Sequence, residues 1–317
     1  MFLQIILLIV GFIILIKGAD IFVDGASSVA LNFKISKMLI GLTIVSFGTS
    51  APEFAVSVKS ILSGSGDIVL GNVIGSNILN ILLIVGVSAI VHSLNVKSAT
   101  VKKELPITIL ISSLFVVLLL DNLIDDRYVN AFTRSDGIIL LLFFSVFIYY
   151  LISMMRNKTD ENTEEKSMPL LKSIIFTVIG IAAIILGSNF VVDSASSLAR
   201  TIGISEKMIA LTIIALGTSL PELVTSVTAT RKGEYDIAIG NVVGSNIFNL
   251  GIVVGIPVTI FRGIDQISFN VIDLIVFLIS AILLFFFSID DRKITRKEGI
   301  IFLIIFIAYY SYVIYAG

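Results

Sequence analysis

Two glutamates, Glu53 and Glu222, lie inside segments that are otherwise apolar. An ionised carboxylate at membrane depth costs several kcal/mol unless it is partnered, and no basic residue lies within five positions of either glutamate. A glutamate that is protonated, or that snorkels to the membrane surface, is the alternative, but snorkelling works near helix ends and both positions are central. Two facing carboxylates carry a charge of −2, which a divalent cation balances.

A proline, Pro52 or Pro221, precedes each glutamate. Proline inside a helix removes the hydrogen bond to the carbonyl four residues earlier, here at Gly48 and Gly217. Backbone oxygens freed in a membrane persist only where a cavity or an ion satisfies them. Since Ca²⁺ takes about six to eight oxygen ligands, the glutamates, the freed carbonyls and the neighbouring Thr and Ser side chains indicate a site for a hard cation.

Polar stripes in two further segments supply the opposing wall of this site. At intervals of four residues, and therefore on one helical face, stand Asn72, Ser76 and Asn80 in one segment and Asn241, Ser245 and Asn249 in the other. Paired glycines accompany each stripe and predict close helix approach, at Gly71, Gly75, Gly240 and Gly244.

The two sets of residues belong to an internal repeat. Residues 18–86 align with residues 187–255 at a constant offset of 169, without a gap, and 33 of the 69 pairs are identical. GTSAPE at 48–53 becomes GTSLPE at 217–222, and GNVIGSNILN at 71–80 becomes GNVVGSNIFN at 240–249. Shared hydrophobicity alone does not preserve Gly, Pro, Glu and Asn in register, so the chain is a duplicated unit.

Composition places these residues in a membrane. The 317 residues are 56% hydrophobic and 14% charged, with a mean hydropathy of +1.06, whereas soluble domains are about 25% charged. A net charge of −1 argues against a nucleic-acid partner, because no excess of positive charge is available to neutralise phosphates. Without cysteine, the chain has no disulfide, no thiolate metal site and no cysteine nucleophile.

Hydropathy predicts an all-α integral membrane protein with ten transmembrane helices. They are expected near 3–30, 36–61, 67–91, 105–120 and 137–155, and again near 171–200, 205–230, 236–260, 270–288 and 298–315. An odd number of spans in each half makes the two copies enter the membrane from opposite sides, as two inverted five-helix repeats. The first repeat covers 1–155, with its motif region at 36–91. A polar linker follows at 156–169, and the second repeat covers 170–317, with its motif region at 205–260.

The distribution of Lys and Arg predicts the orientation. With both termini outside and the 156–169 linker in the cytoplasm, 16 of the 22 basic residues fall on inner loops or adjoining helix ends and 6 on the outer side. Basic residues concentrate on the cytoplasmic side, so this orientation is favoured, in the plasma or inner membrane of a cell.

The duplicated motifs, GTSAPE with GNVIGSN and GTSLPE with GNVVGSN, resemble the two α-repeats of the Na⁺/Ca²⁺ exchanger branch of the cation/Ca²⁺ antiporter superfamily, in its prokaryotic type. The resemblance covers essentially the whole chain. It implies an antiporter in which the two ions use one midplane site in turn, with long first and sixth spans sliding over a rigid core. The substrates would be Ca²⁺ and Na⁺ in a lipid bilayer, with no cofactor and no obligatory protein partner.

The resemblance also implies a ligand set. Carboxylates, hydroxyls, amide oxygens and backbone carbonyls would hold the ions at Glu53, Glu222, Thr49, Thr218, Ser50, Ser219, Ser76, Ser245, Asn80, Asn249, Ser46 and Ala215. Members of the K⁺-dependent branch carry aspartate where this chain has Asn249, so exchange is expected to be independent of K⁺. Transport of three Na⁺ per Ca²⁺, as the resemblance suggests, would make it electrogenic.

Three other functions are compatible with paired carboxylates in a membrane. A Ca²⁺/H⁺ antiporter could use Glu53 and Glu222 to bind protons, although the proton-coupled branch usually carries glutamate where this chain reads GSN. A Ca²⁺ channel could use them as a selectivity ring, but an inverted repeat favours alternating access. An intramembrane enzyme is not expected, since no nucleophile or zinc-binding set accompanies the two acids.

Overall fold

The computed structural model describes residues 2–120, 131–156, 167–204, 209, 212–213, 215–261, 263–264 and 270–316. Part of the predicted linker, residues 157–166, lies outside the described residues, as do residues 205–208 at the start of the expected seventh span.

The first half contains the five expected spans. The first is α1 (Phe2–Phe33), and the second is divided into α2 (Lys37–Ile40), the π-helical turn η1 (Gly41–Val45), α3 (Ser46–Thr49) and α4 (Ala51–Leu62). The third comprises α5 (Gly66–Leu79), the π-helical turn η2 (Asn80–Val85) and α6 (Gly86–Val91). The fourth is η3 (Thr100–Glu104) with α7 (Leu105–Leu119), and the fifth is α9 (Arg134–Arg156).

The second half repeats this order. α10 (Leu170–Thr201) corresponds to α1, and α12 (Ala215–Thr218) with α13 (Leu220–Arg231) corresponds to α3 and α4. The third span of this half is α14 (Tyr235–Phe248), η5 (Asn249–Val254) and α15 (Gly255–Phe261). The last two spans are α16 (Val271–Ile289) and α17 (Arg296–Ala316).

Most of these helices could cross a membrane on their own. By length and composition, the described residues contain seven such helices, or eight if the pair Lys37–Thr49 and Ala51–Leu62, bent by 45°, counts as one span. The continuous helix at 100–119 and the α12–α13 segment supply the remaining two of the ten expected spans.

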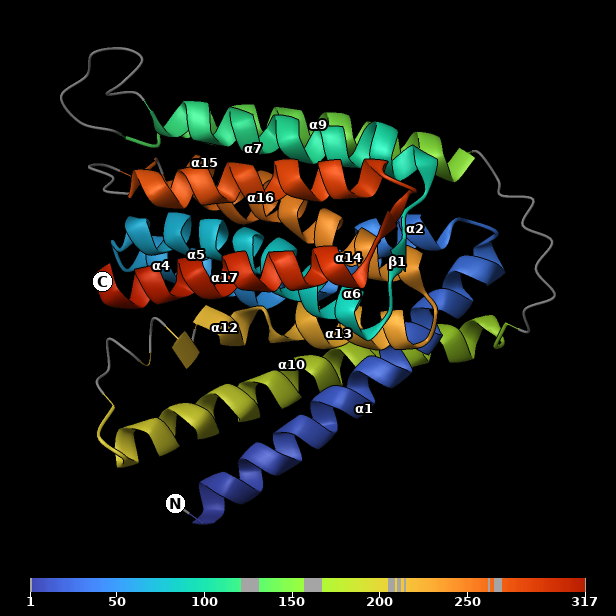
Figure 1. The fold of residues 1–317 in the computed structure, drawn as a ribbon, viewed down its shortest axis with the longest axis horizontal. Helices are drawn as coiled ribbons and strands as arrows, with labels where there is room; N and C mark the ends of the chain where they lie inside the picture. The colour runs from blue at the N-terminus through green and yellow to red at the C-terminus, as the bar shows by residue number, and fades with distance from the viewer. Residues whose placement is uncertain are drawn as a thin grey trace.

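Corresponding helices of the two halves run in opposite directions (Figure 1). α1 and α10 pack antiparallel, because an added Cβ at Gly18 would meet Ala183 and one at Gly25 would meet Thr177. Both chain ends lie at one end of the bundle, called here the terminal end (Figure 1). The opposite end is called the strand end because it carries the two short strands described below. This antiparallel relationship is the inverted repeat that an odd span count predicts.

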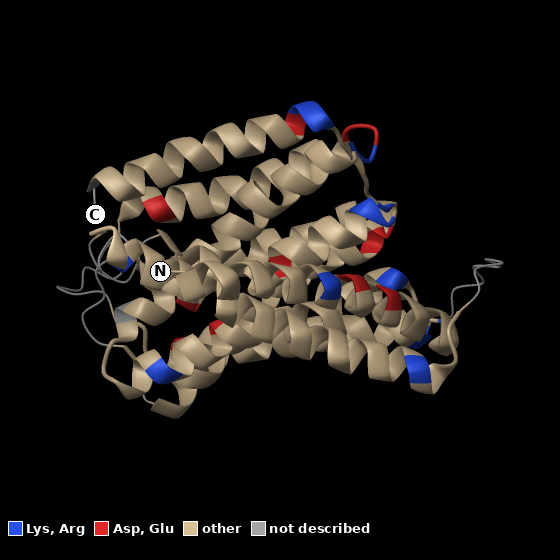
Figure 2. Cartoon of the chain, turned by 90° about the horizontal axis from the view of Figure 1, so that it is seen from below, with Lys and Arg blue, Asp and Glu red and all other residues tan. Residues whose placement is uncertain are grey.

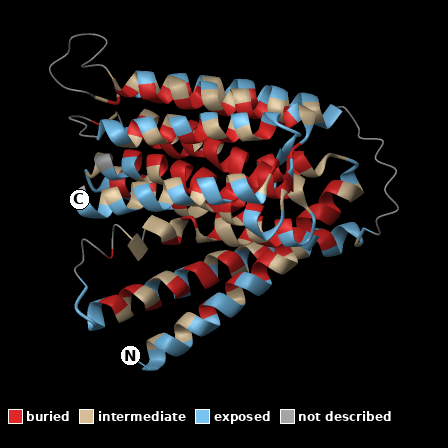
Figure 3. Ribbon diagram, viewed as in Figure 1, coloured by how far each residue is buried: buried red, intermediate tan, exposed pale blue. Residues whose placement is uncertain are grey.

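Burial distinguishes an inner group of helices from an outer one. The hydrophobic windows of Ile68–Val91 and Tyr235–Phe261 are 78% and 94% buried, whereas those of α9 and α17 are 17% and 11% buried. Figure 3 shows the buried residues gathered inside the bundle and the exposed residues on its outer helices. Many of the exposed residues on those helices are large and apolar. Since a bilayer covers such an apolar outer surface, the duplicated motifs occupy the centre of the molecule.

The expected close approach of the glycine pairs is confirmed in the second half. An added Cβ at Gly240 would lie 2.9 Å from the Cα of Gly41, and one at Gly244 would lie 2.7 Å from Oγ of Ser46. For Gly71 and Gly75 no neighbour lies within 4 Å of such a Cβ among the described residues. The repeat offset of 169 indicates which segment should face Gly71 and Gly75, and much of that segment lies outside the described residues. The close approach of these two glycines therefore stays a prediction.

Short backbone pairings join loops of the two halves at both ends of the bundle. At the strand end, β1 (Leu94–Asn95) pairs antiparallel with β2 (Lys293–Ile294). At the terminal end, Phe132 and Ile264 exchange two backbone hydrogen bonds of 2.9 and 2.7 Å. Hydropathy gives no signal for strands this short, so neither pairing was expected from the sequence.

Candidate cation site

The second span of each half breaks just before its glutamate. The breaks fall at Ser50 (φ −82°, ψ 6°) and Ser219 (φ −90°, ψ 4°), and a new helix begins at the next residue. Pro52 therefore lies in the first turn of α4, where the missing N–H has no intrahelical partner to lose. A disruption of the helix beside each proline is confirmed, but the prolines lie in the first turn of a new helix rather than inside one. The Gly217 carbonyl, expected to be freed for the cation, accepts from Oγ of Ser188 at 3.0 Å. Glu53 and Glu222 lie at the third position of their helices, each 1% exposed.

The serines at these breaks bond to the carboxylate of the opposite repeat. Oγ of Ser50 donates to Oε1 of Glu222 at 3.0 Å, and Oγ of Ser219 donates to Oε1 of Glu53 at 3.4 Å. Ser219 also lies 3.4 Å from Oγ of Ser76 on α5. A Ser three residues before a Glu usually forms a capping box within one helix, but neither serine side chain caps its own helix here. The crossed bonds bring α4 and α13 together at their first turns.

The polar stripes on α5 and α14 face these broken helices, as predicted. Nδ2 of Asn72 donates to the carbonyl of Glu53 at 3.4 Å, and Nδ2 of Asn241 donates to the carbonyl of Glu222 at 3.3 Å. Oγ1 of Thr49 donates to Oδ1 of Asn241 at 2.9 Å. Four helices, α4, α5, α13 and α14, therefore enclose one polar region.

The carbonyls of Ser46 and Ala215, predicted as ligands, belong to the first residues of α3 and α12. Oγ1 of Thr49 lies 3.4 Å from the carbonyl oxygen of Ser46, and Oγ1 of Thr218 lies 3.4 Å from that of Ala215. The carbonyl of Ser46 also accepts from the backbone N–H of Ser50 at 3.0 Å, so it lies in the last turn before the break.

Two asparagines that the sequence analysis did not assign to the site join its polar stripes across the centre. Nδ2 of Asn80 donates to Oδ1 of Asn246 at 2.9 Å, and Nδ2 of Asn249 donates to Oδ1 of Asn77 at 3.1 Å. Asn77 and Asn246 are 1% and 2% exposed. The signal that could have found them is their recurrence in both copies of the motif GSN, directly after the predicted serine ligands.

Several oxygen atoms in this region are buried and have no hydrogen-bond partner. They are Oε2 of Glu53, Oε2 of Glu222, Oδ1 of Asn80, Oδ1 of Asn249 and Oγ of Ser245. Buried polar atoms in proteins are nearly always satisfied, so a cluster of unpartnered acceptors calls for a ligand. All five are hard oxygens. The described part of the chain contains no group of three or more His, Cys, Asp or Glu side chains that could hold a metal ion, so a cation here would depend on two carboxylates together with neutral oxygens.

The two halves of the site differ in exposure. Thr49 and Asn241 are both 0% exposed, whereas their repeat counterparts Thr218 and Asn72 are partly exposed. Gly71 is exposed and its counterpart Gly240 is buried. Because α5 starts at the terminal end and α14 at the strand end (Figure 1), the polar region is more open toward the terminal end.

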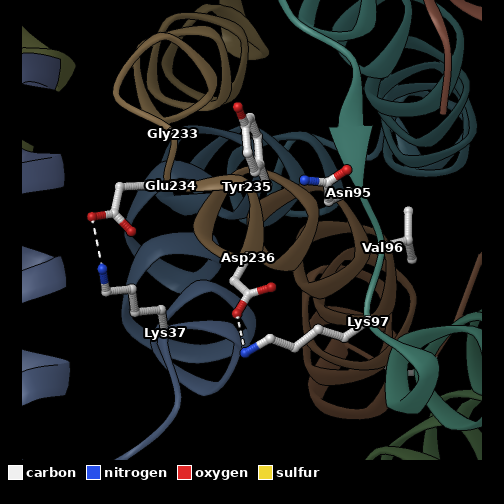
Figure 4. A pocket seen from close by; sticks show the side chains of 8 residues that line it. All are labelled: Lys37, Asn95, Val96, Lys97, Gly233, Glu234, Tyr235 and Asp236. Atoms are coloured by element: carbon white, nitrogen blue, oxygen red, sulfur yellow. Dashed lines mark hydrogen bonds and ion pairs between the residues drawn. The ribbon is translucent and has the colours of Figure 1, made fainter. Parts of the chain in front are cut away.

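Ion pairs close the strand end. Glu234, in the turn before α14, accepts from Nζ of Lys37 and from Oγ of Ser27 on α1, each at 2.9 Å. Asp236 pairs with Lys97 at 2.6 Å. Figure 4 shows both pairs lining a pocket of about 270 Å³ at this end. The acids of this pocket are paired with lysines, so the unpartnered oxygens of the central region distinguish it as the better cation site. Lys and Arg are more frequent toward this end (Figure 2).

Comparison with known proteins agrees with this architecture. The family model described as "Sodium/calcium exchanger protein" matches residues 3–153 and 172–315. The chain belongs to this family. The sodium/calcium exchanger MaX1 of Methanosarcina acetivorans is 32% identical, over 96% of both chains. The inner membrane protein YrbG of Escherichia coli strain K12 is 40% identical, over 83% of this chain and 82% of its own.

A solved structure of the sodium-calcium exchanger NCX_Mj superposes with a TM-score of 0.83, at 32% identity, over 96% of this chain and 97% of that one. The predicted family and fold class are thus confirmed. The protein is an all-α integral membrane antiporter of ten helices in two inverted repeats, and it is a transporter rather than an enzyme. Membership of the family implies Na⁺ and Ca²⁺ as the exchanged ions.

Proposed function

We propose that this antiporter exchanges Na⁺ for Ca²⁺ by alternating access at one site between α4, α5, α13 and α14. The observation that carries the proposal is the cluster of five buried oxygens without a partner, contributed by both repeats. The two carboxylates supply −2, so one Ca²⁺ brings the cluster near neutrality. The names of MaX1 and NCX_Mj, both described as sodium/calcium exchangers, support the same pair of ions.

The ions share ligands and therefore exclude each other. Glu53 and Glu222, with the carbonyls of Thr49 and Thr218, hold Ca²⁺ in this proposal. The same glutamates hold Na⁺ together with Ser76, Ser245 and the hydroxyls or carbonyls of Thr49 and Thr218, and the carbonyls of Ser46 and Ala215 complete the outer and inner Na⁺ sites. Asn80 and Asn249 line the middle of the site, where either ion passes them, and Ser50 and Ser219 support the carboxylates. A full set of Na⁺ and a Ca²⁺ cannot occupy the site together, and this makes the transport an exchange.

Alternating access follows from the inverted repeat. The partly exposed Asn72 and Thr218, together with the ion-paired strand end, support a state that is open toward the terminal end. We place the termini outside and the 156–169 linker in the cytoplasm, in the cell or inner membrane, because of the bias of basic residues. The similarity to NCX_Mj, whose structure concerns extracellular ion exchange, favours an outward-facing state.

Independence from K⁺ and electrogenic exchange belong to the same proposal. Asn249 is fully buried and contributes an amide rather than a carboxylate, so the site has no third negative charge to attract a further cation. With three Na⁺ exchanged for one Ca²⁺, each cycle moves one net charge.

The test is ⁴⁵Ca²⁺ uptake into proteoliposomes that contain the purified chain. An outward Na⁺ gradient is expected to drive uptake, and a pH gradient of equal size without Na⁺ is expected to leave it at background. Uptake driven by the pH gradient alone would identify a Ca²⁺/H⁺ antiporter, and uptake that needs neither gradient would identify a channel.

A further inference from the structure

The side chains of Asn77 and Asn246 meet at the centre of the bundle as repeat counterparts, since their numbers differ by 169. Nδ2 of Asn77 donates to the backbone carbonyl of Asn246 at 3.2 Å, and Nδ2 of Asn246 donates to that of Asn77 at 3.5 Å. These reciprocal bonds fix α5 against α14.

The reciprocal bonds determine which way each of these amides faces. A backbone carbonyl can only accept, so the amide atom of Asn246 that faces the Asn77 carbonyl must be Nδ2. Oδ1 of Asn246 then faces Asn80, which must present its own Nδ2, as the bond of 2.9 Å shows. The carbonyl half of the Asn80 amide is thereby turned away, and its Oδ1 is one of the unpartnered buried oxygens.

Asn249, in the second repeat, is oriented in the same way by Asn77. Nδ2 of Asn77 donates to the backbone carbonyl of Asn246, so Oδ1 of Asn77 faces Asn249 and accepts from its Nδ2 at 3.1 Å. Oδ1 of Asn249 is consequently also left without a partner. An asparagine without such a constraint could turn either Nδ2 or Oδ1 toward a cation, and Nδ2 cannot act as a ligand.

We propose that Asn77 and Asn246 are positioning residues, which hold Asn249 and Asn80 with their side-chain oxygens directed at the transported cation. Neither residue touches the ion in this proposal. The π-helical turns η2 and η5 begin at Asn80 and Asn249, and such turns often mark functional positions in helices. This inference rests on the proposed function, because it concerns the same site.

A double-mutant cycle in proteoliposomes tests the proposal, with Ca²⁺ KM and maximal rate measured separately. Asn80→Ala removes the oxygen that faces the cation, and Asn246→Ala removes the bond that directs it. Each is expected to raise the KM for Ca²⁺ about tenfold, which corresponds to about 1.4 kcal/mol. The KM of the double variant should be no higher than that of the single variant with the larger increase, because Asn246 acts through Asn80. The matched control combines Asn246→Ala with Asn249→Ala. Asn246 bonds to Asn80 and Asn77 bonds to Asn249, so the effects of these two substitutions on the free energy of Ca²⁺ binding should add.

Additive effects of Asn246→Ala and Asn80→Ala, or a loss of maximal rate with an unchanged KM, would mean that Asn246 only packs the helices and would overturn the proposal. If Asn246→Ala does not fold, Asn246→Ser and the equivalent cycle of Asn77→Ala with Asn249→Ala give the same comparison. Wild type and Glu222→Gln are measured in parallel. If the wild type shows no Na⁺-driven uptake, or if Glu222→Gln shows normal uptake, the proposed function itself fails. If both behave as expected and the cycle is additive, only the positioning role of Asn246 is overturned.

Discussion

Oγ of Ser50 in the first repeat lies 3.0 Å from Oε1 of Glu222 in the second, and Ser219 makes the equivalent bond to Glu53. Each repeat therefore holds the carboxylate of the other. Neither half can move its glutamate without disturbing a hydroxyl of its partner, so the position of the two charges depends on how the halves are packed together.

Removal of these hydroxyls should weaken Ca²⁺ binding. Hydrogen bonds to charged groups contribute about 1.5–3 kcal/mol, so Ser50→Ala and Ser219→Ala are each expected to raise the Ca²⁺ KM about tenfold or more in ⁴⁵Ca²⁺ exchange. Ser63→Ala is the matched control, because Oγ of Ser63 donates to the carbonyl of Ser60 at the far end of α4 from Glu53. A KM that rises equally in all three variants would contradict a specific role of the crossed bonds.

Neutralisation of either glutamate should abolish most exchange. Loss of one partner from a buried charge interaction costs about 2–5 kcal/mol, so Glu53→Gln and Glu222→Gln are expected to reduce exchange about a hundredfold. Both variants should keep the fold, as judged by size-exclusion profile and thermal stability. Glu298→Gln, which alters a carboxylate that accepts from the backbone N–H of Thr295 near the start of α17, should exchange normally. Near-normal exchange in either site variant would refute a shared site.

The ion pair at the strand end should hold that end closed. Glu234→Gln weakens the contacts with Lys37 on α2 and Ser27 on α1, both half-buried or better. A loss of about 1 kcal/mol shifts the population of open molecules about fivefold. A single cysteine at Ala238, which is 2% exposed, should then react about five times faster with a thiol reagent. The control, Asp24→Asn, disrupts a more exposed pair with Lys232 and should change the labelling rate less. Equal labelling rates in Glu234→Gln and the parent would contradict a role of the Glu234 contacts in closing the strand end.

The proposed orientation can be tested without background, because the chain has no cysteine. A cysteine at Thr163, in the linker and outside the described residues, should react with membrane-impermeant reagents only from the cytoplasmic side. A cysteine at Ser135, exposed at the start of α9, should react only from outside. The reverse pattern in intact cells would invert the topology.

Exchange of three Na⁺ for one Ca²⁺ should respond to membrane potential. In vesicles loaded with Na⁺, each cycle of Ca²⁺ uptake moves one net positive charge outward, so an interior-positive potential should accelerate it. One charge moved through 100 mV corresponds to about 2.3 kcal/mol, which is large enough to measure with a K⁺ gradient and valinomycin. Rates indifferent to potential would indicate electroneutral exchange, and rates that require K⁺ itself would contradict independence from K⁺.

The spans, the repeat and the broken helices could be predicted because their signals are local. Apolar length identifies a span, and Pro52 beside Glu53 identifies the break that the structure places at Ser50. The constant offset of 169 then transfers each assignment to the second half.

Other features depend on packing between residues far apart in the chain. Asn77 follows Ser76 directly, and on a regular helix this places it about 100° away from the predicted stripe. Only the contact of α5 with α14 makes it part of the polar network. The pair of Lys37 with Glu234 spans 197 positions and has no periodic signal. The strand pair β1–β2 likewise joins loops about two hundred residues apart.

The reciprocal contact of Asn77 with Asn246 also bears on how such a chain could arise. Each residue bonds its own counterpart, as in an isologous contact between identical subunits on a two-fold axis. A single five-helix chain inserted in both orientations would meet its copy with asparagine opposite asparagine, and one sequence would supply every bond at the axis. In the present chain the two halves differ elsewhere, as at Lys37 and Glu206, while the residue pair at the axis is the same on both sides.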